Sequence, residues 1–506
     1  MPTALSSTEP AWLRPVRDVG HLLRFRSAAV RRRSTYWLGI GTMLTITLGA
    51  AIIPAVVPAD DDRRLELGVL LPTGMAGILL ISIVSAIASG GGRELVSREQ
   101  AVAFPVSPTT DHLGALVLAP LNISWLIQAW VLLGTTAYVV GPARLVSAHV
   151  VMLLWMAVAT ALAQVVAWSV ESVRRRRHGV VAMRVVVVTL CVGALVVQLS
   201  GRTISLLDQV PTLWVVLGAV GGFSLSWVFV VVGLLGLLLA AVVVGVVPAQ
   251  LAARRLPHDE LRAETDTHTP RPMPWNDLLA LLRIDRASVW RAVPMRRGMA
   301  VLAVGPGLVA VLGNLPWEQV MILPGLVVSG GALLFGVNAW CLDGRGQLWR
   351  ENLPVDAGLV FTARALVLAE FLGVASLVTI ALAALRAGVP TPSELTAIVC
   401  LLVVVTLQVV GGSMRWSEQR PYPVDLRSAR ATPAPPVMMV AYSARLALVT
   451  TITGLLFSGL ARFPDPMLSL FVALVMGGWS TVRLLRAHRR WVDPFVRARV
   501  VTTVAA

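Results

Sequence analysis

Apolar runs of about twenty residues or more recur along the whole chain, and this is the length that lets an α-helix cross the hydrocarbon core of a bilayer. Of the 506 residues, 56% are hydrophobic and 14% are charged, whereas soluble domains carry about 25% charged residues. The mean hydropathy is +0.76. The runs predict an all-α polytopic membrane protein with about 12 transmembrane helices. These spans are expected near residues 36–57, 67–88, 113–140, 145–170, 180–199, 213–247, 298–313, 319–340, 359–385, 395–414, 437–460 and 466–484.

The run at 213–247 is about 35 residues long, which is too long for one straight crossing. We expect Gly221-Gly222 to divide it into a short re-entrant helix and the sixth span.

The basic residues are all arginine, and the formal net charge is +16. If both termini are cytoplasmic and the spans alternate, 37 of the 43 arginines lie on the cytoplasmic side. Such a bias is typical of membrane proteins, so it explains the charge without a nucleic-acid partner. The six arginines outside are Arg63, Arg64, Arg144, Arg202, Arg386 and Arg462.

One stretch occurs twice, at an offset of 249 to 252 residues, which is about half the chain. Each copy contains Arg-Glu, then Pro-Val, then the apolar string Ala-Leu-Val-Leu-Ala. These motifs begin at Arg98, Pro105 and Ala115 in the first copy and at Arg350, Pro354 and Ala365 in the second. The repeat predicts two homologous six-span halves, residues 1–251 and 277–506, joined by a charged, proline-containing cytoplasmic linker at 252–276.

Each half also begins with a similar basic segment. Residues 1–35 place apolar side chains among seven arginines, which is typical of an amphipathic helix on an anionic leaflet. The segment Leu281 to Arg286 repeats the pattern of Leu22 to Ser27. Further along, Arg445 in the eleventh expected span matches Arg184 in the fifth, each at a depth from which arginine reaches the interface.

Catalytic chemistry is not indicated by any motif. A P-loop requires a lysine on the nucleotide phosphates, and the chain has none. The histidines show no metal-ligand spacing, and Cys191, Cys341 and Cys400 are interpreted as small buried apolar residues. We therefore expect no catalytic residue, metal site or cofactor in this chain.

A few polar and aromatic residues inside the expected spans are candidates for a substrate pathway: Trp125, Gln128 and Glu370. An intramembrane carboxylate such as Glu370 often contacts substrate or protons, but it equally suits an ion pair with Arg364 or a hydrogen bond to a hydroxyl. Gln128 suits a hydrogen bond between helices better than a ligand contact. Tryptophans near span ends, including Trp340 and Trp479, are typical of an aromatic belt.

Two six-span halves, each with a charged cytoplasmic loop after its second span, resemble the ABC-2 type exporter permeases. The resemblance implies a bacterial inner-membrane protein that exports hydrophobic or amphipathic compounds: drugs, antibiotics, peptides or lipids. It implies two copies of a separate ABC ATPase subunit, which bind ATP and Mg²⁺, and contact with membrane lipid. The loop residues that would couple to the ATPase are Arg93, Glu94, Arg98, Glu99, Phe104, Pro105, Gln347, Arg350, Glu351, Leu353 and Pro354.

Two other classes of protein compete with this interpretation. A proton-coupled secondary multidrug transporter also has duplicated halves, but it usually needs intramembrane ionisable groups, and Glu370 is nearly alone here. The other class is a membrane-embedded enzyme or a sensor that transports nothing.

Overall fold

The chain is helical and contains no β-strand in the residues that the computed structural model describes. It forms two compact units, Met1–His258 and Asp259–Ala506. Their boundary lies in the expected linker, and the common origin of the two halves stays a prediction. The described residues are 13–28, 33–58, 61–88, 106–121, 123–202, 205–206, 209–254, 272, 274–344, 346–423 and 433–505.

The described residues contain seven helical segments that are long and apolar enough to span a membrane. The structure thus supports a helical membrane protein, and the number of twelve spans stays a prediction. Shorter apolar helices add Met43–Val56, Trp125–Val140, Gly179–Leu190 and Arg445–Leu460. The seven long segments are Asp61–Ile87, Pro142–Arg174, Leu225–Ala253, Trp317–Leu334, Ala357–Ala387, Pro392–Gln419 and Pro466–Val492.

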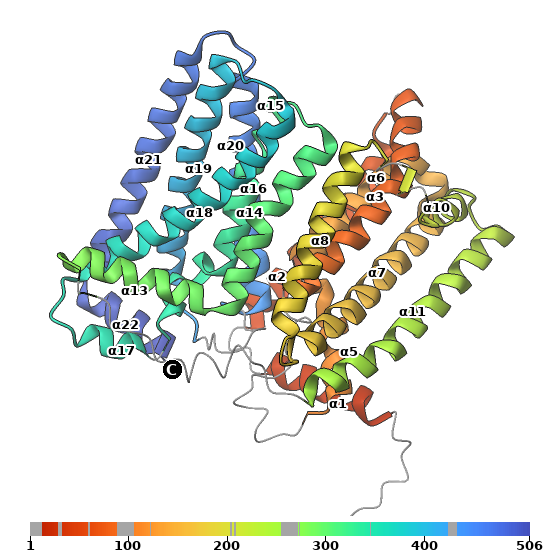
Figure 1. Ribbon diagram of the computed structural model, residues 1–506, viewed down its shortest axis with the longest axis horizontal. Coiled ribbons are helices and arrows are strands. Elements are labelled where there is room, and N and C mark those ends of the chain that lie inside the picture. The colour runs from red at the N-terminus through yellow and green to blue at the C-terminus, as the bar shows by residue number, and fades with distance from the viewer. Residues whose placement is uncertain are drawn as a thin grey trace, which may run out of the picture. The chain divides into compact units, whose positions relative to one another are not determined.

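In the first unit, α1 and α5 lie at one end and α10 at the other (Figure 1). The long run at 213–247 breaks at Gly221-Gly222, as predicted, and Gly222 has a positive φ of 72° that favours glycine. The run expected at 113–140 is also broken, between α5 and α6. The helices are α1 Leu13–Ala28, α2 Arg33–Val56, α3 Asp61–Ala88, α5 Pro108–Leu118, η1 Ala119–Leu121, α6 Ile123–Val140, η2 Pro142–Arg144, α7 Leu145–Arg174, α8 Gly179–Leu199, α10 Thr212–Val220 and α11 Leu225–Ala253.

In the second unit, α13 lies across the ends of the long helices, at the same end as α17 and α22 (Figure 1). The sequence did not indicate α22, which follows the last expected span. The span expected at 319–340 is divided among α15, α16 and η3. The helices are α13 Asp277–Arg291, α14 Val293–Gly313, α15 Trp317–Val320, α16 Leu323–Leu334, η3 Gly336–Leu342, α17 Gly346–Glu351, α18 Ala357–Ala387, α19 Pro392–Gln419, α20 Pro436–Leu460, α21 Pro466–Val492 and α22 Pro494–Ala505.

The two units pair their helices in the same order. The helix that follows the amphipathic segment is α2 in the first unit and α14 in the second. Helix α2 packs against α6, and α14 packs against α18. In the same way, α7 packs against α11 in the first unit, and α19 packs against α21 in the second. The amphipathic helices α1 and α13 in turn contact α5 and α18, the helices in which the Ala-Leu-Val-Leu-Ala strings of the two copies begin.

The Pro-Val motif of the repeat leads directly into the N-cap of the next helix. Ser107 follows Val106, and its hydroxyl accepts a hydrogen bond of 3.0 Å from the N–H of Thr110 at the start of α5. Asp356 follows Val355, and its carboxylate accepts a hydrogen bond of 3.1 Å from the N–H of Leu359 in α18. A side-chain acceptor here satisfies one of the N–H groups that the first helical turn leaves unpaired.

Replacing Asp356 with alanine should therefore destabilise the second unit by about 1 kcal/mol, whereas Asp356→Asn keeps an acceptor and should have a much smaller effect. The measurement is the free energy of unfolding of the purified chain in detergent. Equal stability of the alanine and asparagine variants would contradict the capping role.

Candidate functional site

The second copy of the repeated stretch forms the short helix α17 and the turn that leads into α18. The chain enters α17 through Gly344, whose φ of 47° favours glycine. After Glu351, residues 352 to 356 complete the turn before α18 begins. The predicted coupling residues found here are Gln347, Arg350, Glu351, Leu353 and Pro354.

In the first copy of the repeated stretch, the described residues begin at Val106. Its predicted coupling residues lie outside the described residues: Arg93, Glu94, Arg98, Glu99, Phe104 and Pro105.

Helix α17 has a buried side and an exposed side. Gln347 is buried. Leu348 and Trp349 are 48% and 79% exposed, and Leu353 in the following turn is 50% exposed. These apolar side chains belong to a short segment between two candidate spans, and an apolar patch in such a place is typical of an interaction surface.

The polar side of α17 is held by an ion-pair cluster of four residues: Asp285, Asp343, Arg350 and Arg364. Nη1 of Arg350 lies 2.8 Å from Oδ1 of Asp285 and 2.9 Å from Oδ2 of Asp343. Nε of Arg364 lies 3.1 Å from Oδ2 of Asp285, and Nη2 of Arg364 pairs with Asp343. Arg364 also donates a 2.9 Å hydrogen bond to the carbonyl oxygen of Ala339.

Each member of the cluster comes from a different segment. Asp285 lies on α13, Asp343 follows η3, Arg350 lies on α17 and Arg364 lies on α18. The side chains of Asp285 and Arg364 are fully buried, and those of Asp343 and Arg350 are 9% exposed. Buried charges are tolerated when they are paired and hydrogen-bonded, so two arginines and two aspartates give a neutral cluster that ties α17 to α13 and α18.

Asp285 reaches the cluster because of its position on α13. Leu281, Leu282, Asp285 and Val289 are the buried residues of this helix, and their spacing places them on one face. Only one of the four is charged, and the arginines meet it there. The sequence indicated the amphipathic helix, but the two partners of Asp285 are 65 and 79 residues away in the chain, and no local pattern identifies them.

The equivalent positions in the first half carry different residues. The repeated strings align Asp285 with Arg26 and Arg364 with Gly114, whereas Arg350 aligns with Arg98. At the same offset as Arg350, Asp343 aligns with Gly91, so the first half lacks both acidic members and one basic member of the cluster. This set of four charged residues therefore occurs only in the sequence of the second half.

Helix α22 adds a second contact to α17. Nε of Arg497 lies 2.9 Å from Oε2 of Glu351. Nearby, Trp491 stacks on Trp340 with ring centroids 3.6 Å apart and planes 6° apart. Trp340 is fully buried, so its expected place in an aromatic belt was wrong. Trp479, which is 60% exposed, still suits such a belt.

The residues expected along a substrate pathway make contacts within their own units. Trp125 donates a 2.9 Å hydrogen bond to Thr160, and Gln128 accepts one of 3.0 Å from Ser82 on α3. Glu370 pairs with Arg286 on α13 at 2.8 Å rather than with Arg364. These contacts fit the interpretation of helix-to-helix bonds, and a role of these residues in transport stays a prediction.

Cys341 lies beside the ion-pair cluster in η3 and is buried. Burial raises the pKa of its thiol to about 12, so the sulfur is neutral and unreactive at physiological pH. This agrees with its interpretation as a small buried apolar residue, as does the burial of Cys400.

Comparison of the chain with models of protein families, with curated proteins and with solved structures finds no match. Its function is therefore argued from the geometry of its own residues.

The ion-pair cluster predicts unequal effects for two carboxylates that both pair with arginine. Asp285→Ala leaves two buried arginines short of a partner and should destabilise the second unit by about 3–5 kcal/mol. Glu370→Ala removes a pair whose members are 47% and 40% exposed, and such pairs contribute about 1 kcal/mol or less.

The measurement is thermal unfolding in detergent, in which 1 kcal/mol shifts Tm by about 2–4 °C for a domain of 150–250 residues. Asp285→Ala should lower Tm by roughly 10 °C and Glu370→Ala by a few degrees at most. Similar Tm values for both variants would show that the cluster does not hold the unit together.

Proposed function

We propose that the chain is the membrane-spanning permease subunit of an ATP-driven exporter, which a separate ABC ATPase subunit powers. The observation that carries the proposal is the attachment of α17. Its polar side is fixed to α13 and α18 through the buried ion-pair cluster, and its opposite side exposes Leu348 and Trp349.

This arrangement suits the transmission of force. A soluble motor can move a permease only through a segment that does not yield when it is pushed. Moving α17 away would strip Arg350 from Asp285 and Asp343, and such a separation of buried charges is strongly unfavourable. The same two aspartates pair with Arg364 on α18. A movement of α17 is therefore passed on to α18, which is long and apolar enough to be a span.

The exposed side suits recognition of a partner protein. Tryptophan is enriched among the residues that dominate protein–protein interfaces. Trp349 is 79% exposed and Leu353 is 50% exposed, so a groove on the partner can bury them. ATP hydrolysis is assigned to that partner because the chain has no lysine for a P-loop. Two ATPase copies are expected, one for each half.

The direction and the substrate class rest on the resemblance to exporter permeases. Hydrophobic or amphipathic compounds, such as drugs, antibiotics, peptides or lipids, match the mostly apolar helices. The alternative, a proton-coupled secondary transporter, requires a carboxylate that changes protonation during transport. Glu370 is the candidate, and its carboxylate is already held in a 2.8 Å ion pair with Arg286.

The test is purification of the tagged chain from its native membrane, followed by mass spectrometry and an ATPase assay. We expect a protein with a Walker A motif to copurify. Trp349→Ala should weaken its binding about 30-fold or more, the effect of truncating an interface hot spot. Trp275→Ala is the matched control, because Trp275 is also an exposed tryptophan but lies outside α17.

Trp349 is a better probe than Glu351, since charge reversal at Glu351 would also break its pair with Arg497. Two results together would overturn the proposal in favour of the secondary transporter. The chain would purify without a partner, and vesicles that contain only this chain would move substrate when a pH gradient is applied.

A further inference from the structure

Five arginines from three helices gather at one end of the second unit. This arginine cluster consists of Arg415 on α19, Arg445 on α20 and Arg483, Arg486 and Arg490 on α21. The spacing of the last three, at intervals of three and four residues, places them along one side of α21. Arg415 lies near the end of α19, and α19 packs against α21.

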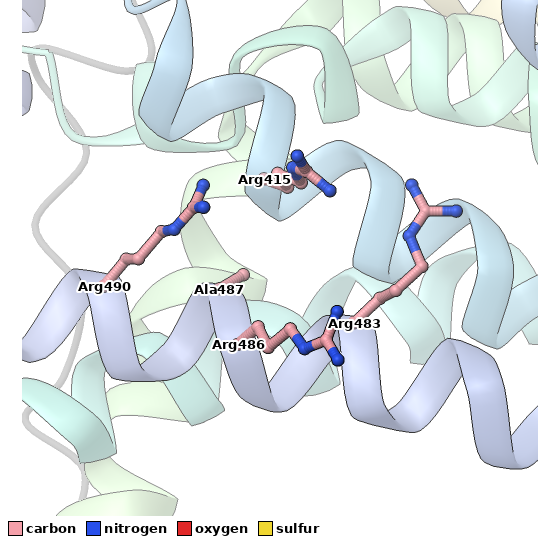
Figure 2. Close-up of a pocket in the computed structure, with 5 residues that line it drawn as sticks. All are labelled: Arg415, Arg483, Arg486, Ala487 and Arg490. Atoms are coloured by element: carbon pink, nitrogen blue, oxygen red, sulfur yellow. The ribbon is translucent and has the colours of Figure 1, made fainter.

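Four of these arginines line a cavity of about 100 Å³ together with Ala487. Figure 2 shows Arg415 on one side of the cavity and Arg483, Arg486 and Arg490 on the helix opposite. The fifth arginine, Arg445, lies close enough to Arg483 for their charges to repel each other. Arg415 repels Arg483 in the same way. A water molecule takes about 30 Å³ of liquid volume, so the cavity has room for a small oxyanion.

The positive charge of the cluster is not neutralised by ion pairs. Over the described part of the chain, no carboxylate oxygen lies within 4.0 Å of these guanidinium nitrogens. Glu418 is the nearby acid whose charge acts on Arg415 and Arg490, yet both of its oxygens are buried without a hydrogen-bond partner. Even with Glu418 ionised, five arginines against one carboxylate leave a net charge of +4.

A neutral side chain holds two of the arginines in place. The Gln419 amide lies 3.2 Å from Nη1 of Arg490 and 3.2 Å from Nε of Arg415, and its oxygen accepts from both when it is turned toward them. Like charges that are kept together without a counter-charge destabilise a protein. Arg350 and Arg364 in the same unit show the usual solution, since each is paired with aspartates.

We propose that this cavity binds a phosphate group. Guanidinium groups form planar, bidentate hydrogen bonds with phosphate oxygens, and the cluster provides donors from two sides of a cavity of suitable size. The neighbouring surface of α21 is apolar, with Trp479 60% exposed and Leu485 54% exposed, so acyl chains can pack beside it. The headgroup phosphate of an anionic lipid and free inorganic phosphate share the chemistry that the cavity recognises.

The test uses the full chain, purified in a phosphate-free, uncharged detergent and stripped of lipid. Three probes are titrated while tryptophan fluorescence reports binding: dioctanoyl-phosphatidylglycerol, dioctanoylglycerol, which has the same chains but no phosphate, and inorganic phosphate. We expect phosphatidylglycerol to bind at least ten times more tightly than dioctanoylglycerol, since a hydrogen bond to a charged group corresponds to a factor of about ten or more.

Two substitutions on α21 separate a site from a general surface charge. Arg486→Gln removes an arginine that lines the cavity, whereas Arg489→Gln removes an exposed arginine of the same helix that does not. Arg486→Gln should weaken phosphatidylglycerol binding about tenfold or more, and Arg489→Gln by less than about twofold. Arg486 also lies 6.0 Å from the ring centroid of Trp479, a contact that contributes about 1 kcal/mol or less at an exposed site. Without lipid, Arg486→Gln should therefore lower Tm by a few degrees at most, and this controls for misfolding.

The arms of the titration also identify the source of the phosphate. Tight binding of phosphatidylglycerol with weak binding of inorganic phosphate assigns the site to a lipid headgroup, and the reverse assigns it to a free anion. Either of two outcomes would overturn the proposal. In the first, Arg486→Gln and Arg489→Gln weaken phosphatidylglycerol binding equally. In the second, phosphatidylglycerol binds no more tightly than dioctanoylglycerol, and inorganic phosphate does not bind.

Discussion

One end of the second unit depends on a cluster of ion pairs, in which two aspartates neutralise two arginines. Asp285, Asp343, Arg350 and Arg364 come from four separate segments, and none of them is tolerated in a buried place without the others. The cluster therefore forms as a whole or not at all. This is why a helix as short as α17, Gly346–Glu351, which would not be stable alone, is held in a defined position by Arg350.

The same residue type serves two different purposes in this unit. Arg364 is fully buried and paired with carboxylates, so its charge is neutralised within the protein. Arg483 and Arg486 face a cavity without a carboxylate partner among the described residues, so their charge remains available to a ligand. A bias of arginine toward the cytoplasmic side describes both groups equally well. Only the neighbours of each side chain distinguish a structural arginine from one that can bind an anion.

The repeated stretch likewise combines a shared backbone role with unequal side-chain chemistry. In both halves, Pro-Val is followed by a residue that caps the next helix, Ser107 or Asp356. The ion-pair cluster, however, has no full counterpart in the first half, where Arg26 and Gly114 align with Asp285 and Arg364. The motif that the halves share thus precedes a capped helix in both units, whereas the four charged residues of the cluster occur together only in the sequence of the second half.

The sequence by itself determined the helical, membrane-spanning class, the break at Gly221-Gly222 and the amphipathic character of α13, because each depends on the length or period of a local pattern. It did not determine the partners of Asp285, the burial of Trp340 or the existence of α22. Nor did it indicate that Arg415 would meet three arginines of α21, about 70 residues further along the chain. Those features depend on which side chains meet when distant helices pack, and charges that lie far apart in the sequence become partners or remain unpaired only at that stage.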